Sequence, residues 1–162
     1  MKRSKQTAAG EAATELILEV FRLNGRLLVT GDRLVAPLGL TSARWQVLGA
    51  ITLAEQPQPV AWLARSMGLN RQGVQRIVNE MIDDGLVETR PNPHHRRAHH
   101  IVLTRRGRDA YMRAAGLQAP WVTDIVKGIS RDEIATALRV AATLRRRLER
   151  DLKGEGAGEE DA

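Results

Sequence analysis

The sequence predicts a mainly α-helical fold that carries one small β-hairpin. Three observations lead to this prediction. Aromatic residues make up only 3% of a chain that is 43% hydrophobic, so the core must consist largely of Leu, Ile, Val and Ala. Apolar residues recur at steps of three and four over long segments, which is the helical period. Only two short runs, at 86–90 and 99–104, have the pattern of strands.

Charge and composition limit the classes of protein to which the chain can belong. The net charge is +6 although the tail is acidic, which favours nucleic acid or another polyanion as a partner. The absence of cysteine excludes disulfides, thiol nucleophiles and cysteine-containing zinc sites. No apolar run approaches the roughly 20 residues that cross a bilayer, and no signal peptide is evident. We therefore expect a soluble, cytoplasmic protein with no membrane partner.

Breaks in the helical period divide the chain into six expected helices. They are expected at residues 12–34, from the cap Thr41 to the "QPQP" at 56–59, at 60–67, at 71–84, from the cap Thr104 to about Gly128, and from Ser130 onward. The prolines of "QPQP" end the second helix because proline lacks an N–H. Ser130 and Glu133 have the spacing of a capping box, which marks the start of the last helix.

The centre of the chain has the element order of a winged helix-turn-helix: helix, glycine turn, helix and hairpin. Asn70 can cap the second of these helices, whose polar face consists of Asn70, Arg71, Gln72, Gln75, Arg76 and Asn79. Gln and Asn can bind adenine edges in the major groove, and Arg can bind guanine. A polar stripe is usually a solvated helix face. The lack of acids in the first half of this helix, beside a basic hairpin, favours DNA contact instead.

The hairpin is strongly basic. Between Thr89 and Arg108 there are six arginines and no Asp or Glu. Arg96 and Arg97 lie at the expected tip, from which an arginine can reach phosphates or a narrow minor groove.

All four histidines of the chain, His94, His95, His99 and His100, also lie in the hairpin. They could form a metal site, a DNA-proximal basic tip or a solvated loop. Neighbouring side chains of a strand point to opposite faces, so an adjacent pair cannot easily supply two ligands to one ion. The surrounding arginines and the lack of a carboxylate also oppose a cation. We expect no metal site and favour the basic tip.

The runs "LTSARWQVLGAI" and "LARSMGLNRQGVQRIVNEMIDDGLVETRPNPHHRRAHHIVLTRRG" resemble the MarR family of bacterial transcription regulators over about residues 40–110. The resemblance implies a homodimer, paired through its first and last two helices, whose two winged helices read a palindromic site. Arg71, Gln72, Gln75 and Arg76 match the recognition-helix positions, and Arg97 matches the wing arginine. The resemblance also implies a small, often aromatic, anionic effector that lowers DNA affinity. One position departs from the family pattern: His95 replaces the Asp that usually braces the wing arginine.

These expectations divide the chain into five segments. They are a disordered arm (1–11), an N-terminal dimerisation helix (12–37), the winged helix-turn-helix domain (38–108), C-terminal dimerisation helices (109–153) and a disordered acidic tail (154–162). Trp45 and Trp62 are candidates for lining an effector pocket, although core packing is the commoner role of such residues.

The expected function is that of a ligand-responsive DNA-binding regulator, specifically a dimeric repressor that binds double-stranded DNA. No catalytic motif is evident, so we expect neither an enzyme nor a cofactor. Two alternatives remain open. The chain could be a winged-helix protein-interaction module, or a metal-responsive sensor that uses the histidine cluster.

Overall fold

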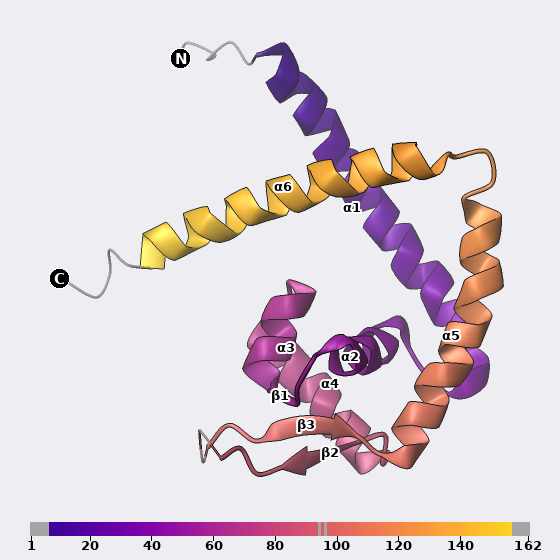
Figure 1. Cartoon of the computed structure of the whole chain (residues 1–162), viewed down its shortest axis with the longest axis vertical. Coiled ribbons are helices and arrows are strands. Elements are labelled where there is room, and N and C mark those ends of the chain that lie inside the picture. Colours follow the sequence, from indigo (N-terminus) through magenta and orange to yellow (C-terminus); the bar gives the residue numbers. More distant parts are fainter. Residues whose placement is uncertain (1–6, 94, 96, 157–162) are drawn as a thin grey trace. The chain divides into compact units, whose positions relative to one another are not determined.

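The computed structural model describes residues 7–93, 95 and 97–156, with side chains up to residue 152. Its elements are α1 (Ala8–Val35), η1 (Ala36–Leu38), α2 (Ser42–Leu53), β1 (Gln58–Pro59), α3 (Val60–Met67), α4 (Arg71–Asp83), β2 (Val87–Arg90), β3 (His100–Leu103), α5 (Arg105–Ile125) and α6 (Arg131–Gly156) (Figure 1). They form two compact units, residues 1–119 and 120–162. The prediction of a mainly helical chain with a winged helix-turn-helix is confirmed.

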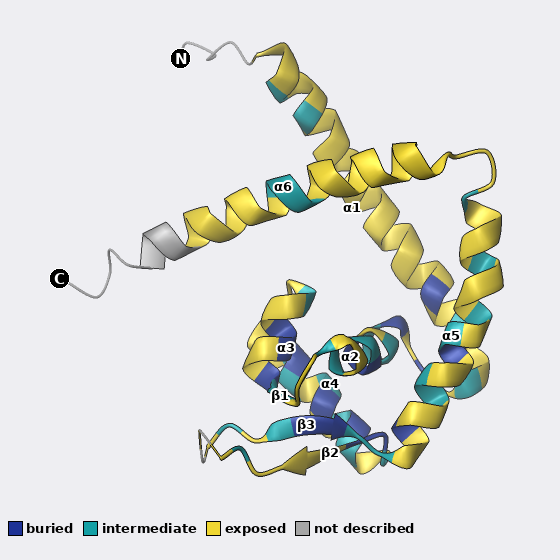
Figure 2. Ribbon diagram, in the orientation of Figure 1, coloured by how far each residue is buried: buried dark blue, intermediate teal, exposed yellow. Residues whose placement is uncertain are grey.

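The core of the first unit is formed by α2, α3, α4 and the strands, where the buried residues gather in Figure 2. Among its fully buried side chains are Leu48, Leu63, Val74, Val78 and Met81. Burying one such side chain stabilises the fold by about 1.5–3 kcal/mol. This core fixes α4 against α2 and α3 and leaves its other face free.

The small sheet has three antiparallel strands in the order β1-β3-β2. Strands β2 and β3 lie where the sequence predicts them. Strand β1 is not predicted, because the "QPQP" stretch indicates locally only the end of a helix. Pro59 lies opposite His100. A proline is acceptable there because β1 is an edge strand, and an edge strand need not donate every ladder hydrogen bond.

Three helix ends differ from the expected positions. Helix α1 begins at Ala8 rather than residue 12, because the Thr7 hydroxyl accepts a hydrogen bond from the Gly10 N–H (3.1 Å) and caps the helix earlier. Helix α5 ends at Ile125, before the expected Gly128, and contains Pro120 in its interior. Helix α6 continues to Gly156, past the expected start of the tail. Residues 1–6 and 157–162, which hold most of the arm and tail, lie outside the described residues.

Thr104 joins the end of the wing to α5, as its predicted role as a cap requires. Its Oγ1 donates to the carbonyl of Gly85 (2.7 Å) and accepts from the Gly107 N–H (3.0 Å). Gly107 is buried, and a β carbon there would lie 1.9 Å from the carbonyl oxygen of Leu86. The first turn of α5 therefore packs directly on the backbone that leads into β2.

The predicted capping box begins α6. The backbone N–H and the hydroxyl of Ser130 both donate to Glu133 Oε2 (2.8 and 2.6 Å), and the Glu133 N–H donates to Ser130 Oγ (3.3 Å). The hydrogen bond from the Ser130 side chain, followed by that from its backbone, lowers the pKa of Glu133 below its ordinary value.

We expect this lowered pKa to make the first turn of α6 sensitive to acid. A carboxylate with a lower pKa in the folded state stabilises that state above the unfolded pKa, and the contribution disappears as the pH falls through the folded pKa. Glu133→Gln should remove this acid-side change in stability, whereas Asp132→Asn, in the same turn, should retain it. An NMR titration of the Glu133 carboxyl checks the direction. A midpoint no lower than that of an unstructured peptide would contradict the prediction.

No helix in the described part of the chain combines the length and the apolar composition needed to cross a membrane.

Candidate nucleic-acid interface

Helix α4 is positioned by the turn before it and by its apolar stripe. Gly68 ends α3 with φ +67°, a left-handed conformation that glycine adopts without a steric penalty. Asn70 then caps α4, with its Oδ1 accepting from the Gly73 N–H at 2.7 Å. The buried side chains of Val74 and Val78 hold one side of the helix on the core. The opposite side of α4 therefore faces solvent with its N-terminal turn fixed.

The predicted recognition residues lie together on this free side. Five of the six are exposed and Gln75 is half-buried: they are Asn70, Arg71, Gln72, Gln75, Arg76 and Asn79. Four of them form hydrogen bonds within the chain, including Arg76, which donates to Glu80. The Asn70 oxygen is engaged as the cap, and Gln75 Nε2 donates to Asn79 Oδ1 (2.9 Å). The face thus presents an ordered set of amide and guanidinium groups, which is the chemistry that reads base edges in a major groove.

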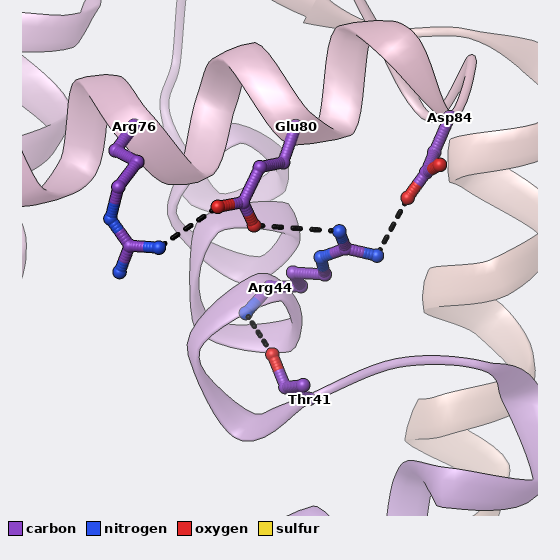
Figure 3. A network of polar contacts seen from close by, with 5 residues as sticks. All are labelled: Thr41, Arg44, Arg76, Glu80 and Asp84. Atoms are coloured by element: carbon purple, nitrogen blue, oxygen red, sulfur yellow. Dashed lines mark hydrogen bonds and ion pairs between the residues drawn. The ribbon is translucent and has the colours of Figure 1, made fainter.

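A polar network that the sequence does not predict connects this face to α2 (Figure 3). Arg76 Nη1 lies 2.9 Å from Glu80 Oε1, and Arg44 Nη2 lies 3.5 Å from Glu80 Oε2. Arg44 also reaches Asp84, with Nη1 2.7 Å from Oδ2. The Arg76–Glu80 spacing of four residues is readable in the sequence, but no local pattern points to Arg44, which lies 36 positions before Glu80.

The exposure of these side chains indicates what the network does. The Arg44 side chain is 21% exposed, that of Glu80 is 42% exposed and that of Arg76 is 74% exposed. An exposed pair four residues apart on a helix contributes only about 0.3–0.5 kcal/mol to stability. The Arg76–Glu80 pair therefore matters less for helix stability than for where it places charge on the α4 face.

The tip of the wing is braced by its backbone and by Asn92. Asn92 Nδ2 donates to the carbonyl of Ala98 (3.0 Å), and the N–H groups of His95 and Ala98 close two successive turns. Arg97 is exposed, and the structure shows no ion pair for it among the described residues. His95 is exposed as well. Arg96 and His94 lie outside the described residues, so the structure does not test their predicted positions.

The remaining histidines and wing arginines are dispersed. His99 is exposed, whereas His100 is half-buried in β3 opposite Arg90. Arg90 is paired with Glu88 (2.9 Å), and Arg108 Nη1 donates to the carbonyl of Leu103 (2.8 Å). In the part of the chain that is described, no three His, Asp or Glu side chains come together as a metal site.

A cleft of about 560 Å³ lies between η1, the end of α4 and the first half of α5. Its lining residues are Leu38, Gly39, Leu40, Asp84, Leu86, Arg105, Arg106, Asp109, Ala110 and Arg113. Neither candidate pocket tryptophan lines this cleft. Trp45 packs against the core, and Trp62 on α3 is 38% exposed. Their assignment to an effector pocket stays a prediction.

Comparison with known proteins gives consistent matches. Residues 38–98 match the model of the MarR family. An uncharacterized protein of Mycobacterium tuberculosis is 42% identical over 93 residues, which are 57% of this chain and 64% of that protein. BadR, a transcriptional activatory protein of Rhodopseudomonas palustris, is 31% identical over 103 residues, 62% of this chain and 59% of BadR. The chain thus covers less than two thirds of the length of these relatives.

Solved structures match over more of the chain. The transcriptional regulator PA3341 has 27% identity and a TM-score of 0.72, over 83% of this chain and 98% of that one. MosR of M. tuberculosis, solved in complex with DNA, has 26% identity and a TM-score of 0.63, over 80% of this chain and 97% of MosR. Both of these proteins are named as transcriptional regulators. Residues 38–98 therefore match the MarR family in sequence, and the element order and three-stranded wing of the chain agree with the fold of these transcription regulators.

Proposed function

We propose that this chain is a homodimeric, ligand-responsive repressor that binds a palindromic operator in double-stranded DNA. The observation that carries the proposal is the exposed polar face of α4, fixed at its N-terminal end and free of acids in its first two turns. MosR, solved in complex with DNA, supports DNA as the partner. A basic net charge of +6 agrees with a polyanionic partner.

In this proposal α4 enters the major groove and the wing lies along the backbone or in the minor groove. The groove-facing residues are Asn70, Arg71, Gln72, Gln75, Arg76 and Asn79, and Arg96 and Arg97 act from the wing. Two copies related by a two-fold axis would read half-sites about one helical turn apart, roughly 34 Å.

Dimerisation is proposed for α1 and for the helices after the wing, corresponding to residues 12–37 and 109–153. Helix α1 exposes an unusual number of large apolar side chains: Leu16, Ile17, Leu18, Val20, Phe21, Leu23, Leu27, Leu28 and Val29. Helix α6 exposes Ile134, Leu138, Val140, Leu148 and Leu152. Contiguous exposed apolar surface of this kind is typical of a protein–protein interface.

The response to a small aromatic or anionic effector is also part of the proposal. CouR of Rhodococcus jostii, whose fold this chain shares at 22% identity and a TM-score of 0.68, was solved with p-coumaroyl-CoA. Repression is the expected direction, whereas BadR is named an activatory protein. A promoter–reporter strain with and without the chain decides the direction, since a repressor lowers reporter output.

Replacing Arg76 should test base readout, and replacing Arg97 should test binding to the DNA backbone. A bidentate arginine–guanine pair is worth about 1–3 kcal/mol, so Arg76→Ala should weaken operator binding about 5- to 150-fold per half-site. Arg97→Ala should weaken binding to all duplexes more evenly. The slope of the logarithm of the binding constant against the logarithm of the salt concentration (the salt slope) should also become less steep, by about 1 for each phosphate that the variant no longer neutralises. Fluorescence anisotropy with a sequence-selected duplex and a random duplex, at several salt concentrations, measures both.

Glu55→Ala provides the control, because this exposed residue lies between α2 and β1, outside both the proposed DNA-contacting residues and the helices proposed for dimerisation. Its affinity for the selected duplex should equal that of the wild type. Unchanged affinity in both the Arg76 and Arg97 variants would overturn the proposal. Equal affinity of the wild type for selected and random duplexes would instead favour a winged-helix protein-interaction module.

A further inference from the structure

We propose that Glu80 is a specificity-determining residue, which directs Arg76 toward a base edge and away from the DNA backbone. The inference rests on the proposed function, because it assigns a role within that DNA interface. It concerns the one carboxylate that contacts a proposed base-reading arginine among the described residues. A surface that only attracts DNA is not expected to carry a negative charge, nor to pair that charge with one of its own arginines.

The pairing with Glu80 leaves one edge of the Arg76 guanidinium available to recognise a base. Its Nη1 is bound to Glu80 Oε1 at 2.9 Å, and the structure shows no other hydrogen bond to this guanidinium within the described residues. Nε and Nη2, which form one side of the planar group, remain available as two parallel donors. Two parallel donors match the O6 and N7 acceptors of guanine.

The charge of Glu80 discriminates between the two kinds of DNA target. A phosphate attracts a guanidinium chiefly through charge, and a carboxylate beside that guanidinium repels the phosphate. A guanine edge carries no net charge and is bound through the geometry of its hydrogen bonds. Glu80 therefore weakens binding of Arg76 to any backbone more than it weakens binding to the correct base.

Arg44 keeps this carboxylate in place from the side away from Arg76. It contacts Glu80 Oε2 at 3.5 Å and is itself anchored by Asp84 at 2.7 Å, as Figure 3 shows. Arg44 lies in the first turn of α2, where its backbone N–H donates to the Thr41 cap. Glu80 would consequently remain beside the interface even when Arg76 turns toward DNA, so its effect persists in the complex.

Glu80→Gln tests the proposal with little change in shape, because glutamine keeps an oxygen that can accept from either arginine. Binding to a random duplex should become about 3- to 10-fold tighter, and its salt slope should steepen by about 0.9 for each phosphate newly neutralised. The ratio of affinities for selected and random duplexes should fall at least about 3-fold. Anisotropy titrations between about 50 and about 200 mM salt, where such binding changes steeply with ionic strength, provide both quantities.

Asp83→Asn is the matched control. It removes the same charge from the last residue of α4, and Asp83 is exposed and pairs with neither Arg76 nor Arg44 among the described residues. Its affinity ratio and salt slope should stay close to those of the wild type. Equal changes in Glu80→Gln and Asp83→Asn would reduce the effect to net charge and overturn the proposal.

The background Arg76→Ala separates specificity from stability. Glu80→Gln made in that background should no longer change the affinity ratio, since the arginine on which Glu80 is proposed to act is absent. A thermal melt reports whether either variant is destabilised, and a purely structural role would move the melt and leave the ratio unchanged. If the wild type prefers the selected duplex and Glu80→Gln keeps the same affinity ratio, Glu80 does not have the proposed role in specificity. If the wild type shows no preference, the proposed function itself fails.

Discussion

Gly107→Ala is expected to destabilise the winged-helix unit by roughly 3 kcal/mol, the upper range for overpacking a core. The added β carbon would lie 1.9 Å from the carbonyl oxygen of Leu86, which is backbone and cannot rotate away. Either α5 or the chain leading into β2 must shift. The gain of about 1 kcal/mol in helix propensity from alanine offsets only part of this destabilisation. Urea unfolding followed by circular dichroism measures the difference.

Gly116→Ala is the matched control on the same helix. A β carbon there meets no atom within 4 Å, so the change in helix propensity acts alone. We expect unchanged or slightly higher stability, by up to about 1 kcal/mol. Similar unfolding midpoints for the two alanine variants would show that α5 does not pack against Leu86 as described.

Leu23→Asp is expected to convert the proposed dimer into monomers and to abolish operator binding. Leu23 is 53% exposed on α1 in the single chain, within the apolar surface proposed for dimerisation. A buried carboxylate without a partner occurs twice in a two-fold interface and costs at least about 3 kcal/mol. The dimer dissociation constant should thus rise about 100-fold or more. Analytical ultracentrifugation over a concentration series measures it.

Asn24→Asp introduces the same charge one residue further along, at a position that is already polar. This variant should remain dimeric and should bind the selected duplex as the wild type does. A wild-type protein that sediments as a monomer at micromolar concentration would contradict the proposed dimer. A Leu23→Asp variant that remains dimeric would contradict the proposed place of Leu23 in its interface.

Features that depend on local sequence were predictable. The caps Thr41, Asn70, Thr104 and Ser130 each precede a helix in the structure, because a short polar side chain that satisfies free N–H groups leaves a local signal. The apolar stripe of α4 likewise identified its buried side, and hence the polar side that bears the proposed interface. The roles of the individual interface residues stay predictions.

Features that depend on long-range contacts were not predictable. Strand β1 has only two residues and exists through its pairing with β3, about 40 positions later. The close approach at Gly107 involves Leu86, and Glu80 is held by Arg44 from another helix. A single sequence contains no periodic or capping signal for such pairs, since they arise only when the elements pack.

Pro120 makes the hydrogen bonding of α5 uneven along the length of the helix. Near its start the helix is anchored, because Thr104 and Gly107 tie it to the backbone between α4 and β2. At Pro120 the backbone lacks the N–H that would bond to the Gly116 carbonyl, and the ring crowds that carbonyl. The boundary between the two compact units falls at this same position, between Ala119 and Pro120. The chain therefore passes from one unit to the next at the residue inside α5 that cannot donate a helix hydrogen bond.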